Sequence, residues 1–75
     1  EFFIYPNPSD NGLITIINGA IINQISTYTV SGQLINMIDG NNQTKHILKT
    51  PKTPGLYFIE IYDQYSIKKK SVLVR

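Results

Sequence analysis

The chain has 75 residues, no cysteine and a formal net charge of +2. A chain of this length forms one small domain, and without cysteine neither disulfides nor a thiolate metal site can supplement its core. Thirteen isoleucines, five tyrosines and three phenylalanines against a single alanine favour strands, because branched and aromatic side chains pack well on a pleated sheet. We therefore expect one all-β domain over residues 1–75.

Seven short strands are predicted, separated by turn signals. In chain order they cover residues 2–5, 13–17, 25–30, 34–38, 44–49, 56–62 and 67–74. Between the first two, Pro6 and Pro8 lack backbone donors and favour extended geometry, which suits a sheet edge. Gly32 is the sharpest hairpin signal and Gly55 opens the sixth strand, since glycine accepts a positive φ without steric cost.

Alternation along these strands predicts which side chains face the core. Tyr28, Val30, Ile59 and Ile61 are expected to be buried, and Ile47 is expected to face inward from the fifth strand. Regularly spaced turns and the absence of a helical period predict a seven-stranded antiparallel sandwich of immunoglobulin-like architecture. No helix longer than one turn is expected.

Formal charge is divided unevenly along the chain. Residues 1–44 carry three acids and no base, a charge of −3, whereas residues 45–75 carry all seven bases and two acids, a charge of +5. Such a concentration of bases is most often a solvated face, and it also suits docking onto an acidic protein surface or anionic headgroups. The run from Lys68 to Lys70 has a further structural interpretation, because lysines on an edge strand discourage another chain from pairing with it.

The sequence offers no recognisable catalytic or metal-binding arrangement. His46 is the only histidine and has no second metal ligand at a recognised spacing, so we expect it to be an exposed strand residue. The five carboxylates are scattered, and no glycine-rich run could hold a phosphate. The aromatic residues stand at core-like positions, which disfavours a nucleic-acid groove. We therefore expect no enzyme activity, no cofactor, no metal, no nucleic-acid partner and no transmembrane segment.

Four motifs stand in a fixed order along the chain. They are Tyr5-Pro6-Asn7-Pro8, similar to Y-P-N-P; Thr27 to Ile35, similar to I-Y-D-V-S-G-K-L-V; Gly55 to Ile59, similar to G-x-Y-x-V; and a basic and apolar final strand, Lys68 to Arg75. Together they resemble the C-terminal sorting domain (type A) of the type IX (Por) secretion system of Bacteroidetes. Thr29 and Ser71 depart from the family pattern, which often has an acidic or amide residue and a lysine at these places.

The resemblance implies that residues 1–75 are the single C-terminal sorting domain of a larger cargo protein. Such a domain folds in the periplasm and is recognised by the type IX machinery at the outer membrane. It is commonly then removed by a cell-surface sortase, which leaves the cargo at the surface or secreted. The domain acts by recognition only, and strand addition to an exposed edge is the docking mode we expect.

The expected recognition residues belong to the final strand. They are Lys68, Lys69, Lys70, Val72, Leu73, Val74 and Arg75, which combine the main basic cluster with an apolar tail. The expected structural motif residues are Pro6, Asn7, Pro8, Gly32, Gly55 and Tyr57.

The alternative function is that of an accessory immunoglobulin-like module in a secreted enzyme or adhesin, serving as a spacer or a carbohydrate-binding domain. The predicted fold does not separate the two functions, because this sandwich hosts many. A carbohydrate-binding module would need an exposed aromatic platform, and the chain has no tryptophan to build one.

Overall fold

The computed structural model describes residues 2–75, which form five antiparallel strands. They are β1 (Phe2–Tyr5), β2 (Leu13–Thr29), β3 (Leu34–Lys49), β4 (Gly55–Asp63) and β5 (Ile67–Val74). In the single sheet β1, β2, β4 and β5 are neighbours in that order, and β3 also pairs with β2. The predicted all-β antiparallel class is confirmed, and no helix occurs within residues 2–75.

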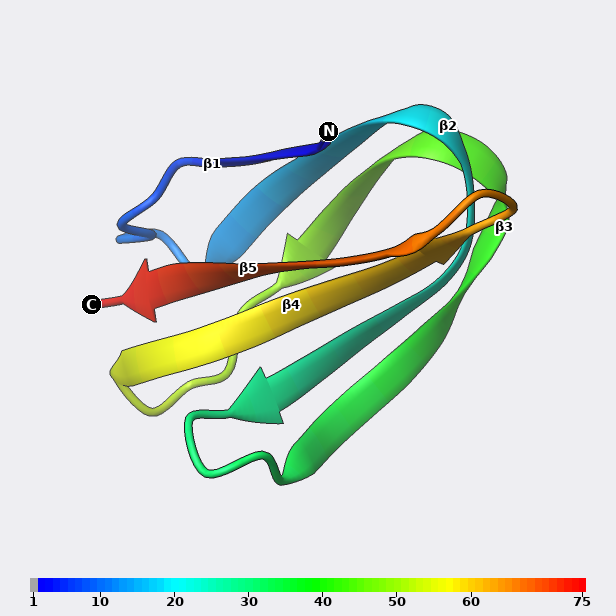
Figure 1. Ribbon diagram of the computed structural model, residues 1–75. Coiled ribbons are helices and arrows are strands. Elements are labelled where there is room, and N and C mark those ends of the chain that lie inside the picture. Colours follow the sequence, from blue (N-terminus) through cyan, green and yellow to red (C-terminus); the bar gives the residue numbers. More distant parts are fainter. Residues whose placement is uncertain (1) are drawn as a thin grey trace.

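The strands β2 and β3 are long because each continues through a bend where a turn between two strands was expected. Ile17 pairs with Lys45 before the bend and Ile25 pairs with Ile38 beyond it, with register shifts between them. Figure 1 shows the two strands turning over together, so that the halves of β2 lie on opposite sides of the molecule. The first half of β2 pairs with β1 and the second half with β4.

The predicted count of seven strands is therefore wrong, because two pairs of predicted strands are each one bent strand. The expected immunoglobulin-like sandwich of two sheets is not confirmed. The five strands make one continuous sheet that curls into an open half-barrel (Figure 1).

The bend of β3 is centred on Gly40, which is buried against β2. Asn41 and Asn42, directly after it, have φ values of 51° and 56°, a left-handed conformation that asparagine tolerates better than most residues. Asp39 Oδ1 accepts a hydrogen bond from the Asn41 N–H at 2.8 Å, which fixes this conformation. A Cβ atom at Gly40 would overlap the backbone carbonyl of Ile22, so the two strands can approach here only because residue 40 is glycine.

The hydrophobic core lies inside the curl and is built from alternate residues of β1, β2, β4 and β5, as the pleat of a sheet requires. Its members are Phe2, Ile14, Ile16, Ile22, Ile25, Tyr57, Ile59, Ile61, Val72 and Val74. The predicted burial of Ile59 and Ile61 is confirmed, since these side chains are 2% and 0% exposed.

The predicted burial of Val30 and Tyr28 is wrong. Val30 is 60% exposed, because β2 ends at Thr29 and Val30 lies in the following turn. Tyr28 is half-buried on the outer face of the sheet, where its hydroxyl donates to Glu60 Oε1 at 3.3 Å.

The predicted orientation of the segment around His46 is also wrong. Ile47, expected inside, is 66% exposed, while Leu48 packs against the core. His46, expected in solvent, is half-buried, and its Nε2 lies 2.7 Å from the carbonyl oxygen of Gly40. The register of β3 on β2, which the bend sets, determines the inward face here, and the local sequence pattern does not.

Candidate recognition site

The segment between β1 and β2 lies along the outer edge of β5. Asn7 Nδ2 donates to the carbonyl of Ser71 at 3.1 Å, and Asn7 Oδ1 accepts a hydrogen bond from the Leu73 N–H at 3.0 Å. Ser9 N–H donates to the Leu73 carbonyl at 2.8 Å, and Arg75 N–H donates to the Ser9 carbonyl at 2.9 Å. The asparagine side chain thus pairs with β5 as a neighbouring strand would, since its amide offers both a donor and an acceptor. The first motif and the last strand form one structural unit.

The prolines on either side of Asn7 explain why its side chain makes this pairing. Pro6 and Pro8 have a fixed φ and no N–H, so this part of the chain cannot continue β1 as a regular ladder. Backbone pairing begins only at Ser9, which forms a parallel bridge with Val74. Ser9 is fully buried and its Oγ donates to the carbonyl of Leu13 at 2.9 Å, which fixes the end of the segment.

Side chains of β5 point alternately into the core and into solvent. Val72 and Val74 are 1% and 4% exposed, so these two predicted recognition residues are core residues of the folded domain. Lys68 and Lys70 share their inward face and are half-buried. The outward side chains are those of Ile67, Lys69, Ser71, Leu73 and Arg75, all of them exposed.

The three consecutive lysines do not form one basic patch, because they lie on both faces of the sheet. Lys70 Nζ lies 5.6 Å from the centre of the Phe2 ring and 5.4 Å from that of Phe3, within the range of a cation–π contact. Lys69, on the outer face, has its Nζ 4.0 Å from Glu60 Oε2. Part of the charge that the sequence concentrates here is therefore used within the domain.

Lys68 belongs to a polar network between β2 and the turn that joins β4 to β5. Its Nζ lies 3.4 Å from Asp63 Oδ2 and donates to Asn18 Oδ1 at 3.0 Å. Asn18 Nδ2 donates to Asp63 Oδ2 at 2.9 Å, and Asp63 Oδ1 accepts the N–H groups of Tyr65 and Ser66, each at 2.8 Å. The hydrogen bond from Asn18, the backbone N–H groups and the charge of Lys68 hold the pKa of Asp63 far below its ordinary value.

The outer face of β4 carries a second polar group at its centre and apolar residues at its end. Glu60 Oε1 accepts hydrogen bonds from Tyr28 at 3.3 Å and from Tyr62 at 3.0 Å. The bond to Glu60 raises the pKa of Tyr62, because the carboxylate stabilises the protonated phenol. Leu56 pairs with Leu73 of β5, and both are exposed.

The remaining motif residues lie at a turn or at the start of β4. Gly32 has a φ of 92°, and its N–H donates to the Thr29 carbonyl at 3.0 Å to close the turn between β2 and β3. Gly55 has a φ of 153° at the start of β4. Tyr57 is buried, and its hydroxyl donates to the Thr53 carbonyl at 2.6 Å, which ties the preceding loop to the sheet.

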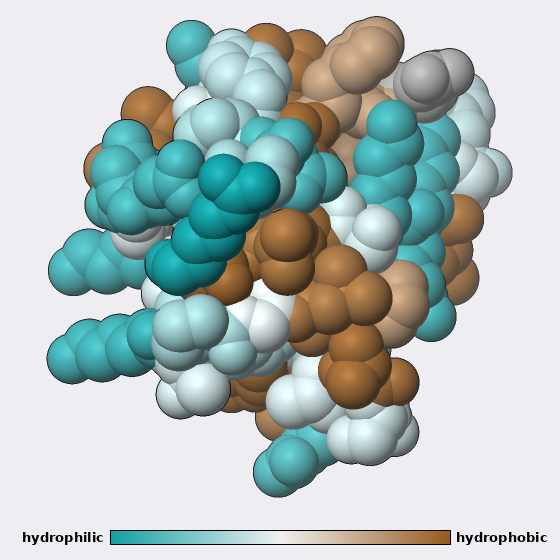
Figure 2. Space-filling model, turned by 90° about the vertical axis from the view of Figure 1, so that its left-hand side faces the viewer, coloured by the Kyte–Doolittle hydropathy of each residue, from teal (hydrophilic) through white to brown (hydrophobic). Residues whose placement is uncertain are grey.

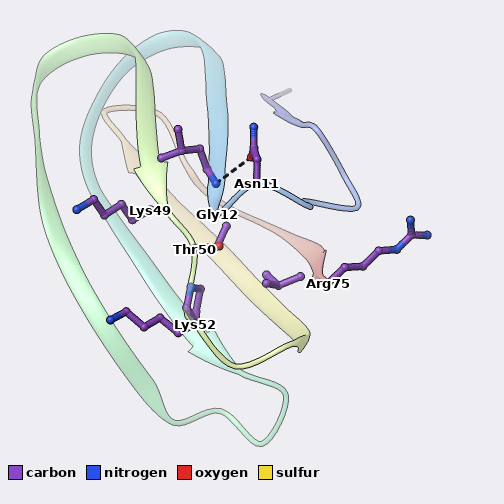
Figure 3. A pocket seen from close by; sticks show the side chains of 9 residues that line it. Asn11, Gly12, Lys49, Thr50, Lys52 and Arg75 are labelled. Atoms are coloured by element: carbon purple, nitrogen blue, oxygen red, sulfur yellow. Dashed lines mark hydrogen bonds between the residues drawn. The ribbon is translucent and has the colours of Figure 1, made fainter.

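The end of the half-barrel at which β5 finishes has a mixed surface, where Figure 2 shows hydrophobic side chains beside strongly hydrophilic ones. A pocket of about 390 Å³ opens here, with Leu13 and Val74 among its lining residues. Lys49, Lys52 and Arg75 border it, but their charged groups extend away from its centre to opposite sides (Figure 3). The pocket therefore lacks the converging polar groups that a small-molecule site requires.

Within residues 2–75 no three histidine, aspartate or glutamate side chains lie together in a way that could hold a metal ion. The same part of the chain contains no helix long and apolar enough to cross a membrane.

A family model of the secretion system C-terminal sorting domain matches residues 3–75, which include all four motifs and the whole of β5. The chain belongs to this family, the type IX sorting domains. The resemblance found in the sequence is thus confirmed, and so is the function: the domain is a C-terminal sorting signal for type IX secretion. The match does not favour the alternative of an accessory module. No curated protein matches the chain.

Membership of the family defines the sorting domain's partners in outline. It works with the type IX secretion machinery and belongs to a cargo polypeptide, and that cargo is secreted or carried at the cell surface.

Sequence reasoning missed two parts of the site. The amide pairing of Asn7 with β5 joins residues 64 and 66 positions apart, a separation that no local pattern reveals. The network of Asn18, Asp63 and Lys68 could not be predicted, because Asn18 and Asp63 both lie where the sequence indicates a turn. The alternation of β5, by contrast, could have separated inward from outward lysines, since it follows from the two-residue period of a strand.

Proposed function

We propose that the type IX machinery recognises the folded sorting domain through the outward side chains of β5, chiefly Lys69, Leu73 and Arg75. The observation that carries this proposal is the alternation along β5. Val72 and Val74 are buried in the core, so a partner that binds the folded domain cannot touch them. The outward positions offer a basic and apolar surface that gives both electrostatic attraction and a shape to dock.

The expected recognition residues that point inward, among them Lys68 and Lys70, then have a structural role. Lys68 is held by Asp63, and Lys70 lies over the rings of Phe2 and Phe3. These contacts fasten β5 to the rest of the sheet, so Lys68 and Lys70 affect sorting only through stability.

Contact with the face of β5 replaces strand addition to its edge as the docking mode. From Ser71 to Arg75 the outer edge of β5 is already paired with Asn7 and Ser9. An incoming strand would have to displace these four hydrogen bonds, whereas a partner that contacts outward side chains leaves them intact.

The route that fits this domain begins with folding in the periplasm and continues with recognition at the outer membrane and removal by a cell-surface sortase. The domain takes part by recognition alone and performs no bond chemistry. The first motif and the last strand are in contact only in the folded chain. This contact supports a receptor that binds the folded domain and does not bind the unfolded one.

An export assay with matched variants tests the proposal. Residues 1–75 are fused behind a leader-bearing reporter in a host with the type IX system, with Lys69→Gln and Leu73→Ser introduced together. Because both side chains are exposed, and an ion pair as exposed and long as that of Lys69 with Glu60 contributes little, we expect a nearly unchanged melting temperature. The export yield should fall about tenfold, equivalent to about 1.4 kcal/mol of binding.

The matched control carries the same two kinds of change away from β5, Lys52→Gln and Leu34→Ser, where both side chains are also exposed. This control should export normally. Two results would show that the machinery does not recognise the outward face of β5. One is an equal loss of export in both fusions, and the other is full export of the β5 variant with its circular dichroism unchanged.

A further inference from the structure

The outer edge of β3 is the long free edge of the sheet. β3 pairs with β2 along one side, and no other strand of residues 2–75 pairs with it. The outer edge of β5, in contrast, is paired with Asn7 and Ser9 over its second half. A free strand edge presents unpaired N–H and C=O groups that another strand can bind.

Along β3 the side chains of one face stand in solvent while those of the other pack inward. Ile38 and Leu48 pack against the core, and Gly40 is buried. The residues that alternate with them point outward, and among these Met37 and Ile47 are 53% and 66% exposed.

Opposite charges stand on the two halves of the same outward face. Asp39 lies in the half before the bend and Lys45 in the half after it, and both are exposed. The hydrogen bond from the Asn41 N–H to Asp39 Oδ1, at 2.8 Å, holds the carboxylate in place. The edge is therefore acidic at one end and basic at the other.

We propose that the β3 edge binds the β3 edge of a second copy of this chain, antiparallel, about a two-fold axis at Asn42. In this one register Met37 lies opposite Ile47 of the other copy, and Asp39 lies opposite Lys45 of the other copy. The two-fold axis produces each pair twice, as an isologous interface does.

Two independent matches select the register. Residue 42 is midway between Met37 and Ile47, the two most exposed apolar residues of β3, and also midway between Asp39 and Lys45. Apolar pairs and opposite charges directly across an antiparallel pair of strands are both stabilising, whereas like charges there are destabilising. A shift by two residues would separate Asp39 from Lys45, including the shift that places Ile35, which is 42% exposed, opposite Ile47.

The bend of β3 is compatible with this pairing. A two-fold axis perpendicular to the sheet at Asn42 keeps the concave sides of both copies on the same side, so the curl continues from one copy into the other. Asn41 and Asn42, with positive φ, interrupt the ladder at the axis. The interface consequently has two arms, residues 35–39 of each copy against residues 45–49 of the other.

Cysteine cross-linking tests the register, and the chain has no cysteine of its own to interfere. Met37→Cys and Ile47→Cys are made as separate proteins, mixed in equal amounts and oxidised gently. Residues directly opposite in an antiparallel pair have Cβ atoms about 4.5–5.5 Å apart, close to the range of a disulfide. We expect disulfide-linked dimers in the mixture and few with either variant alone, since each position faces the other one and not itself.

Charge exchange with sedimentation equilibrium tests the affinity. Asp39→Lys and Lys45→Asp each place like charges opposite one another twice, so each single variant should raise the dimer dissociation constant about tenfold. The double variant restores opposite charges and should return the constant to within about threefold of the wild type, with circular dichroism confirming the fold of all three.

Each other outcome overturns the proposal. If the wild-type chain remains monomeric at about 1 mM, the β3 edge does not bind a second copy and stays available to a strand of a different protein. A dimer that forms equally in all charge variants, or cross-links that form as readily within each single-cysteine sample as in the mixture, shows an interface elsewhere.

Discussion

Replacing Gly40 with alanine should lower the free energy of unfolding by about 3 kcal/mol, at the upper end of the cost of overpacking. The added Cβ would overlap the backbone carbonyl of Ile22, and a backbone atom cannot rotate away as the end of a side chain can. The strands β2 and β3 would have to separate at the bend on which the whole curl depends. The expected fall in melting temperature is about 12–24 °C, at about 4–8 °C per kcal/mol for a domain of this size.

Gly19→Ala is the matched control for this change. Gly19 lies in the bend of β2, its φ is ordinary, and a Cβ there would meet no atom within 4 Å. We expect a change of less than about 1 kcal/mol, because alanine lowers the entropy of the unfolded chain without a steric cost in the folded one. Similar melting temperatures for the two variants would contradict the close approach of β2 and β3 at Gly40.

Replacing Asp63 with asparagine should destabilise the domain clearly at neutral pH and progressively less in acid. The side chain of Asp63 is 1% exposed, and its loss of charge leaves Lys68 without its partner. Breaking a largely buried pair costs more than the pair itself contributes, because the remaining charge, here on the half-buried Lys68, stays partly desolvated.

The pH dependence follows from the lowered pKa of Asp63. A carboxyl group with a lower pKa in the folded state stabilises the fold above its unfolded pKa, about 3.9, and loses that contribution as the pH falls through the folded pKa. Urea unfolding at a series of pH values should therefore show the wild type more stable at pH 7. The two curves should approach each other as the pH falls below about 4.

Asp10→Asn is the control for a surface carboxylate. Asp10 Oδ1 lies 3.9 Å from Arg75 Nη1, and both side chains are well exposed, so little stability should be lost at any pH. A stability difference between wild type and Asp63→Asn that stayed constant from pH 7 to pH 2 would contradict the role assigned to the charge of Asp63.

The positions of most strand residues could be predicted from the sequence, but the continuity of the strands could not. Asn18-Gly19 and Asp39-Gly40 have the composition of turns, and both pairs occur where a long strand bends and continues. The same residue types occur in turns between strands and in bends within a strand. Whether a strand ends or continues at such residues depends on its pairing with the partner strand. For β3 the partner is β2, which bends at the corresponding place.

The sequence indicated two parts of the candidate site, the final strand and the opening motif. It could not indicate that these two parts are in contact. The contact depends on the side chain of Asn7 and on its two hydrogen bonds to β5. The sequence also presented Lys68, Lys69 and Lys70 as one cluster, although strand geometry places Lys69 on the face opposite to its neighbours. A run of like charges in a strand is thus divided between two environments.

Localisation of the intact fusion tests whether residues 1–75 act as a type IX sorting signal. Residues 1–75 are placed behind a leader-bearing reporter, and the fusion is expressed in a host with the type IX system and in the same host with that system deleted. We expect reporter at the cell surface or in the medium of the first strain, and folded fusion retained in the periplasm of the second. Retention in the periplasm of both strains, with the domain folded, would contradict it.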